Sequence, residues 1–333
     1  MRIAVVGLGA TGSHVARQLV THPVDELIVH DRSARQQGLV VQALRAVVPD
    51  ARLITADPPD VAHPPDVVVL AVPVGRHVAE ARRWVRAGAH VVSVSDGLAD
   101  VEGLLALDGL AGRHHRSIVV GAGFVPGLSC LLARVMAEQF DEVSTVATFT
   151  AGTGGPACAR QHHRALKNMS TEWRDGVWRH HRGGSGRELT WFPDPFGARD
   201  CYRAALPTPV LLQRAMPEVG RISARMAATR RDRFTSWLPM LFPPHRDGGP
   251  GAVRVELRGR RDGAFHTEIV GSIEHPSVAG GVVAAAAAVG AARSRAPIGA
   301  GGIASWPDPR RLYQELRQRG VRAAVFSGVD AAP

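Results

Sequence analysis

The sequence predicts an α/β protein that begins with a doubly wound parallel sheet, and three observations predict it. Residues 1–124 alternate short apolar runs with amphipathic segments, as strands and helices do when helices cover both faces of a sheet. The run 67–72 is continuously apolar and ends in a turn, as a strand buried on both faces does. The first apolar run leads directly into the glycine-rich segment 7–12. In such a sheet, ligands bind at the carboxyl ends of the strands.

A second, α+β domain with a mixed or antiparallel sheet is expected over residues 125–296, after a first domain that spans 1–124. We expect residues 297–333, including a helix over 308–319, to return to the first domain. Turn residues at Asp175-Gly176 and Asp262-Gly263 predict two hairpins. The expected strands of the first domain are 2–7, 26–31, 52–56, 67–72, 90–95 and 117–121, and its expected helices are 13–21, 34–46, 77–87 and 99–111. The second domain is expected to hold helices over 129–140 and 157–169 and β segments over 143–151, 188–192, 252–258 and 264–274.

The composition points to a small-molecule protein of the cytoplasm. No window of the 333 residues approaches the ~20 apolar residues of a membrane span, so we expect no membrane partner. The amino terminus enters a strand at once and the 3 cysteines form no CxxC pair, which favours a cytoplasmic protein without a signal peptide. Although the formal charge is +10, the arginines are spread along the chain without a basic tail. We therefore expect anionic small molecules rather than nucleic acid as partners.

The segment Gly7-Leu8-Gly9-Ala10-Thr11-Gly12 lies between a predicted strand and a predicted helix, which is the setting of a pyrophosphate site. Gly7 permits the tight turn, Gly9 lets the backbone approach the phosphates, and Gly12 lets helix and strand pack closely. Ala10 and Thr11 begin the helix. Asp31 follows Gly7 by 31 − 7 = 24 positions, close to where the acidic ribose ligand belongs. These residues predict a dinucleotide-binding site.

Asp31 also indicates which dinucleotide binds. A carboxylate at this position accepts hydrogen bonds from both ribose hydroxyls of NAD and repels the 2′-phosphate of NADP. Arg32 follows at once, however, and arginine can clamp a 2′-phosphate. The sequence favours NAD and leaves NADP open. The segments Ala71-Val72-Pro73 and Ser95-Asp96-Gly97 end two further strands, and we expect Ala71, Val72, Pro73, Asp96 and Gly97 to face the nicotinamide half.

The change of pattern after the last of these strands carries a more specific signal. Residues 121–129 read Gly-Ala-Gly-Phe-Val-Pro-Gly-Leu-Ser, and residues 140–143 read Phe-Asp-Glu-Val. With the first glycine motif and the run 66–96, these segments resemble the saccharopine dehydrogenase-like family, most closely its lysine ε-dehydrogenase branch. The resemblance covers most of the chain in order. Further matching segments are Phe196-Gly197, Arg214–Pro217, Arg261–Gly263 and Tyr313–Val321.

The resemblance implies an NAD(P)-binding domain, in which Pro126 is a candidate cofactor contact, and a second domain whose sheet supports a homodimer. It also implies hydride exchange between a nicotinamide and the carbon that bears the amine of an amino acid or amino-acid-derived amine, giving an imine in the oxidative direction. Two departures limit the transfer. Many saccharopine-reductase members have Asp where this chain has Val125, so no acid or base role is carried there. Residues 202–209 are apolar and proline-rich where the lysine-oxidising branch has hydroxyl groups and glycine, so the substrate is not carried over.

Two alternatives to this oxidoreductase stay open. One is a non-catalytic, redox-sensing protein that binds a dinucleotide, and the other is a carbonyl reductase on the same fold.

Hydride transfer from an amine also needs a base, and Lys167 and His163 are the candidates. On a helix over 157–169, Arg160, His163 and Lys167 are expected to share one face. Desolvation and cationic neighbours would lower the pKa of Lys167 toward neutrality. His163 needs no such help to titrate near neutral pH.

Arginine binds carboxylates through two parallel hydrogen bonds, so Arg199 and Arg203 are the candidates for a substrate carboxylate, with the adjacent Tyr202. Three pairs of adjacent histidines stand at 114–115, 162–163 and 180–181. Adjacent side chains point in different directions, and we expect no cysteine or carboxylate at ligand spacing from them. We therefore expect no metal site.

Overall fold

The computed structural model describes residues 1–48, 53–55, 59–240 and 245–325. The chain divides into two compact units, one made of Met1–Leu128 and Ser277–Asp308 and the other of Ser129–Pro276 and Pro309–Pro333. The chain thus returns to the first unit earlier than residue 297 and leaves it again after Asp308. Of the expected return over 297–333, only 297–308 lies in the first unit.

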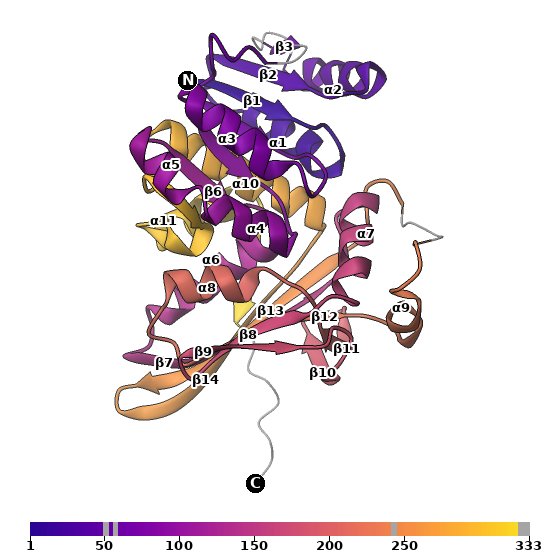
Figure 1. Ribbon diagram of the computed structural model, residues 1–333, viewed down its shortest axis with the longest axis vertical. Helices are drawn as coiled ribbons and strands as arrows, with labels where there is room; N and C mark the ends of the chain where they lie inside the picture. The colour runs from indigo at the N-terminus through magenta and orange to yellow at the C-terminus, as the bar shows by residue number, and fades with distance from the viewer. Residues whose placement is uncertain (49–52, 56–58, 241–244, 326–333) are drawn as a thin grey trace. The chain divides into compact units, whose positions relative to one another are not determined.

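The first unit holds a parallel sheet with the strand order β15-β6-β5-β4-β1-β2-β3. The chain moves outward from β1 through β2 to β3, seen at one edge in Figure 1, and then crosses to β4 on the other side of β1. This reversal makes the carboxyl ends of β1 and β4 a topological switch point, where doubly wound sheets bind their ligands. The strands are β1 (Arg2–Val6), β2 (Glu26–His30), β3 (Leu53–Thr55), β4 (Val67–Leu70), β5 (His90–Ser93), β6 (Ser117–Val120) and β15 (Gly299–Gly302).

The helices of the first unit follow the predicted alternation, with two differences. The first helix begins at Ala10, directly after its N-cap Gly9, and not at 13 as expected. The single helix expected over 99–111 is two short helices, α4 and α5, separated by Ala106 and Leu107. The helices are α1 (Ala10–Val20), α2 (Ala34–Val47), α3 (His77–Ala87), α4 (Leu98–Leu105), α5 (Asp108–Arg113), η1 (Phe124–Leu128), α10 (Pro276–Ala292) and η2 (Ile303–Ser305).

Helix α10 is the buried alanine-rich helix of this unit. It approaches α1 closely at Gly281, where an added Cβ would lie 2.5 Å from the Cβ of His14. Among the described residues, no helix combines the length and hydropathy that a membrane-spanning helix needs.

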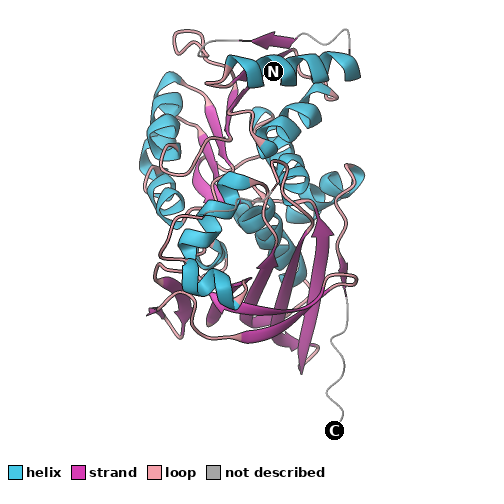
Figure 2. Ribbon diagram, turned by 90° about the vertical axis from the view of Figure 1, so that its right-hand side faces the viewer, coloured by secondary structure: helices cyan, strands magenta, loops and turns pink. Residues whose placement is uncertain are grey.

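The second unit is built on a mixed sheet with the strand order β10-β11-β12-β7-β13-β14-β16, to which β8 and β9 attach beside β12. β12 and β7 are parallel, and the other neighbouring strands of this sheet, within the described residues, are antiparallel. Figure 2 shows its strands in magenta. They are β7 (Glu142–Ala151), β8 (Ser170–Arg174), β9 (Val177–His181), β10 (Glu188–Phe192), β11 (Gly197–Arg203), β12 (Arg221–Ala227), β13 (Gly251–Arg261), β14 (Ala264–Glu274) and β16 (Ala324–Val325).

Both predicted hairpins are confirmed. β8 and β9 are joined by Asp175-Gly176, whose φ angles are 51° and 83°. β13 and β14 are joined by Asp262-Gly263, with φ angles of 52° and 76°. Positive φ at both central residues is the requirement of the type I′ turn that closes two-residue hairpins.

The helices of the second unit include the last helix of the chain, which was expected in the first. It contacts α6, and Arg310 forms an ion pair with Glu138. The strand that follows it pairs with β14. The helices are α6 (Ser129–Ala137), α7 (Pro156–Ala165), α8 (Thr208–Ala215), α9 (Arg230–Thr235) and α11 (Pro309–Gln318).

Candidate functional site

The glycine loop connects β1 to α1, and its first glycine is required by the backbone. Gly7 has φ of +92°, which side chains with a Cβ rarely adopt, and an added Cβ would lie 2.4 Å from the carbonyl oxygen of Ala71. The turn therefore packs against the end of β4.

Gly12 and Gly9 differ in what surrounds them. A Cβ at Gly12 would lie 1.9 Å from the carbonyl oxygen of Gly7, so the helix can approach the loop only without a side chain. A Cβ at Gly9 would meet nothing within 4 Å. The amides of Ala10, Thr11 and Gly12 begin α1 and lack partners inside the helix. Open space beside Gly9 and unpaired helix amides fit a pyrophosphate.

Asp31 follows β2 and braces the loop. Its Oδ2 accepts a hydrogen bond from the amide of Leu8 at 2.7 Å, and its Oδ1 accepts one from the amide of Ser33 at 2.8 Å. A carboxylate oxygen has two lone pairs, so each can still accept a ribose hydroxyl. Arg32 is exposed beside it, so a 2′-phosphate would meet both an attractive and a repulsive charge.

Two glutamines, one bound to the glycine loop and one to Asp31, were missed by the sequence reasoning. Gln36 donates from Nε2 to the carbonyl oxygen of Leu8 at 2.7 Å, and Gln37 accepts from the amide of Asp31 through Oε1 at 2.9 Å. Both lie in the first turn of α2, whose N-cap is Ser33. The signal in the sequence was the presence of two polar side chains within six positions of Asp31.

The cofactor candidates of the first unit all follow strands at the same edge of its sheet. Gly7 follows β1, Asp31 follows β2, and Ala71, Val72 and Pro73 follow β4. Asp96 and Gly97 come after β5, and Gly97 is the N-cap of α4. Pro126 comes after β6, is buried, and forms a cis peptide with Val125. Because the strands are parallel, the structure gathers these residues along the carboxyl edge predicted for the ligand.

His77, the first residue of α3, is fully buried behind this edge. Its Nε2 lies 2.8 Å from the carbonyl oxygen of Val72 and its Nδ1 lies 2.9 Å from Oγ of Ser93. Burial lowers the pKa of His77, although the nearby carboxylates of Asp100 and Asp96 oppose the shift. The ring is therefore neutral, with its hydrogen on Nε2, because a carbonyl oxygen can only accept.

This burial predicts a pH-dependent stability. Below the unfolded pKa of about 6.5, the unfolded chain binds a proton that the folded His77 does not, so stability is full above that pH and falls as the pH drops toward the folded pKa. We expect the free energy of unfolding of the wild type to lose up to about 1.4 kcal/mol more per pH unit than that of His77→Gln. Urea unfolding at about pH 7.5 and about pH 5.5 measures this. Equal losses in the two proteins would contradict it.

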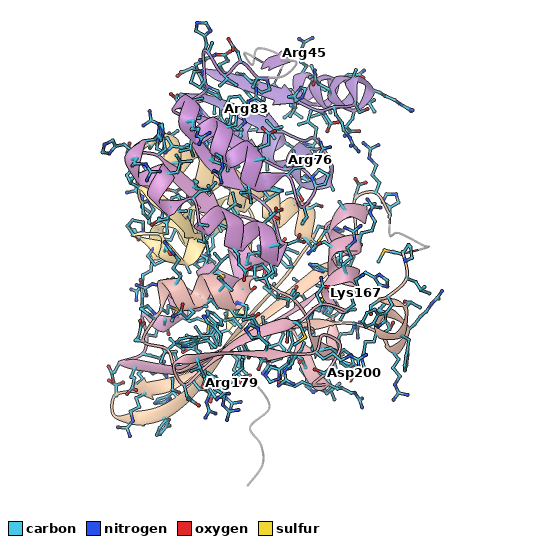
Figure 3. All side chains as sticks on the ribbon, in the orientation of Figure 1. Arg45, Arg76, Arg83, Lys167, Arg179 and Asp200 are labelled. Atoms are coloured by element: carbon cyan, nitrogen blue, oxygen red, sulfur yellow. The ribbon has the colours of Figure 1, made fainter. Side chains whose placement is uncertain are left out.

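In the second unit, the surroundings assumed for Lys167 are not found. Helix α7 ends at Ala165, and Lys167, labelled in Figure 3, lies beyond its end with an exposed side chain. The helix expected to run to 169 is shorter, and the expected desolvation of Lys167 is wrong. Arg160 is exposed as well.

His163 is better placed for proton transfer. Its side chain is 7% exposed, and its Nε2 lies 3.3 Å from Oγ1 of Thr235. The Thr235 hydroxyl donates to the carbonyl oxygen of Arg231 at 2.9 Å. Because the hydroxyl proton is used there, the Thr235 oxygen accepts from Nε2, and a neutral His163 keeps its lone pair on Nδ1.

The three substrate-binding candidates lie on β11 in different environments. Arg203 donates from Nε to Oε1 of Glu172 at 2.8 Å, so its charge is already paired. Arg199 is exposed and lies over the ring of Phe196 at 5.2 Å. Tyr202 is 1% exposed, and its hydroxyl has no hydrogen-bond partner among the described residues.

The expectation that no cysteine stands at ligand spacing from the paired histidines is wrong. Cys158 and His162 are four residues apart on α7, and Sγ lies 3.7 Å from Nε2. The i, i+4 relation brings side chains together on one helix face, which the adjacent pairs cannot do. His114, His115 and His180 are exposed.

Comparison with solved structures gives the fold. Apo saccharopine dehydrogenase (L-Glu forming) from Saccharomyces cerevisiae is 14% identical, with a TM-score of 0.68 over 98% of this chain and 100% of that one. The chain has the saccharopine dehydrogenase-like fold. Amine dehydrogenase from Mycobacterium smegmatis is 15% identical with a TM-score of 0.54, covering 92% of this chain and 96% of its own. An engineered D-amino acid dehydrogenase bound to NADP+ is 17% identical with a TM-score of 0.53, covering 96% and 99%.

No protein-family model and no curated protein sequence matches the chain. The fold predicted from the sequence, a doubly wound parallel sheet followed by a second domain with a mixed sheet, is confirmed by the structure and by these neighbours.

Proposed function

We propose that this chain is an NAD(P)-dependent oxidoreductase that transfers hydride at the C–N bond of an amino acid or of an amine or imine derived from one. The glycine loop carries the proposal, because Gly9 faces open space at the start of α1 while Gly7 and Gly12 exclude any side chain. Asp31 lies within hydrogen-bond reach of the same loop. The neighbours support the substrate class by their names, which refer to saccharopine, amines and amino acids.

Nicotinamide supplies the hydride acceptor or donor when the dinucleotide is bound. The helix amides of Ala10, Thr11 and Gly12 would hold the pyrophosphate, and Asp31 would orient the ribose. The proton of the reacting amine needs a base, and we assign it to Nδ1 of His163, the atom left with a lone pair by the contact with Thr235. Lys167 has no desolvation to support that role.

Among the substrate candidates, Arg199 is the one whose guanidinium is exposed, while Arg203 is held by Glu172 and Tyr202 is buried. We therefore propose Arg199 for the substrate carboxylate and a structural role for Arg203. A cytoplasmic location, a homodimer, no nucleic-acid partner and no metal stay predictions from the sequence.

Turnover tests the reaction class directly. Purified protein with NAD or NADP is offered a panel of amino acids, secondary amines and cyclic imines, and the absorbance of the reduced nicotinamide is followed. Turnover of a C–N substrate is the expected result. Binding of the dinucleotide without turnover would favour the redox-sensing alternative, and turnover of carbonyl compounds alone would favour the carbonyl reductase.

Asp31→Asn tests the choice of dinucleotide. The substitution removes the charge that repels a 2′-phosphate and one acceptor for the ribose hydroxyls, so the ratio of NADH to NADPH affinity should fall by about tenfold, or 1.4 kcal/mol. Fluorescence titration with both nucleotides measures it. General damage to the loop would weaken the binding of both nucleotides by the same factor and leave the affinity ratio unchanged. The ratio therefore serves as the control. An unchanged ratio would show that Asp31 does not contact the ribose.

A further inference from the structure

Two loops at the carboxyl edge of the first sheet are tied together by buried hydrogen bonds. The loop after β4 contains Val72, and the loop after β5 contains Ser95. These loops lie on the side of the switch point away from Asp31, which is the side left for the nicotinamide half once Asp31 takes the adenine ribose.

His77 makes the first tie. Its Nε2 donates to the carbonyl oxygen of Val72 at 2.8 Å, and its Nδ1 accepts from the Ser93 hydroxyl at 2.9 Å. The Ser93 oxygen in turn accepts from the amide of Ser95 at 3.2 Å. His77 and Ser93 are both 0% exposed. The Val72 carbonyl can only accept, so the neutral ring carries its hydrogen on Nε2, and Nδ1 therefore accepts from the Ser93 hydroxyl.

Asp100 makes the second tie between the same loops. Its Oδ2 accepts from the amide of Gly75 and from the Ser95 hydroxyl, both at 2.9 Å. The Ser95 oxygen accepts from the amide of Gly97 at 3.3 Å. Asp100 is 4% exposed and Ser95 is 3% exposed. The Asp100 carboxylate and the His77 imidazole therefore both fix the distance between the two loops.

We propose that His77 is a positioning residue for the nicotinamide, which it orients by fixing the Val72 carbonyl against the Ser95 loop, with Ser93 as its relay. The inference rests on the proposed function. His77 touches neither cofactor nor substrate, and it acts through the backbone groups that line the nicotinamide half. Loss of supporting hydrogen bonds at metal sites costs about 10–100-fold, and a misplacement of about 1 Å between reacting groups can cost about 100-fold in rate.

The ring also has a close mimic. A glutamine amide offers an NH2 donor group and an oxygen acceptor, so the side chain introduced by His77→Gln can donate to Val72 and accept from Ser93. Leucine has similar bulk and makes neither hydrogen bond. His77→Gln and His77→Leu therefore separate hydrogen bonding from packing.

The test compares binding of NADH with binding of ADP-ribose, which lacks the nicotinamide. In the full-length protein, His77→Leu should weaken NADH by about tenfold or more and ADP-ribose by less than about twofold, and His77→Gln should stay within about threefold of the wild type for both. Titration calorimetry measures both ligands, and Ser93→Ala gives the same pattern by a smaller change if His77→Leu does not fold.

Equal weakening of NADH and ADP-ribose by His77→Leu and Ser93→Ala would overturn the inference, because a merely structural role damages both halves of the site. Unchanged binding of NADH in both variants would overturn it as well. Failure of the proposed function looks different. If the dinucleotide site is wrong, the wild type itself binds neither ligand and the inference falls with it. If only the reaction class is wrong, the wild type binds both ligands without turning over a C–N substrate, and the difference between NADH and ADP-ribose in His77→Leu still tests the inference.

Discussion

Gly12→Ala should both destabilise the protein and abolish its dinucleotide site. The new Cβ would stand 1.9 Å from the carbonyl oxygen of Gly7 and 3.1 Å from the Cβ of Ala71. Backbone cannot move aside as a flexible side chain can, so we expect a loss of about 1–3 kcal/mol in the free energy of unfolding, despite the better helix propensity of alanine. Urea unfolding and NADH titration measure the two effects.

Gly9→Ala is the matched variant, because its Cβ meets no protein atom within 4 Å. It should leave the unfolding transition unchanged and weaken NADH by about 10–100-fold, or 1.4–2.8 kcal/mol, through intrusion on the space of the pyrophosphate. If Gly9→Ala binds NADH as the wild type does, the open space beside the loop is not the phosphate site. A wild-type stability for Gly12→Ala would contradict the packing of the loop itself.

His163→Ala should lower turnover by about 10²–10⁴-fold, the usual contribution of a general base. NADH affinity should change little, because the residues assigned to the dinucleotide lie on other elements. The expected control is Lys167→Ala, which removes an exposed side chain and should keep turnover within about threefold. Steady-state rates at saturating dinucleotide, measured with a substrate found in the panel, decide between them.

The opposite pattern, with turnover lost in Lys167→Ala and kept in His163→Ala, would return the role of base to the lysine. Thr235→Val adds a finer test, because it removes the acceptor for Nε2 of His163 while keeping the shape of the side chain. Lower turnover in Thr235→Val with unchanged NADH affinity would show that the contact orients the His163 ring for catalysis.

Features encoded by neighbouring residues were predictable from the sequence. Gly7 and the two Asp-Gly turns depend on backbone conformations that only a few residue types adopt, so their positions could be read directly. Asp31 could be read from its carboxylate and its spacing after Gly7. The alternation of apolar runs predicted the strands β1 to β6 of the parallel sheet, because buried strands are locally apolar. It did not predict β15, whose sequence Gly-Ala-Gly-Gly has no such run.

Features that depend on distant partners could not be read in this way. An amphipathic pattern predicts the helix over 308–319 but not that it packs on α6. The extent of α7 was overestimated by four residues, which placed Lys167 on a helix face that ends before it. His77 looked like an ordinary helix residue, because Val72 and Ser93 reach it only in the folded sheet.

The central claim is that the loop 7–12 with Asp31 binds a nicotinamide dinucleotide, and a direct titration of the purified protein with NADH and NADPH tests it. The account predicts saturable binding of NADH, tighter than that of NADPH and weakened in Gly9→Ala. Absence of binding by either nucleotide to the folded wild type would contradict it.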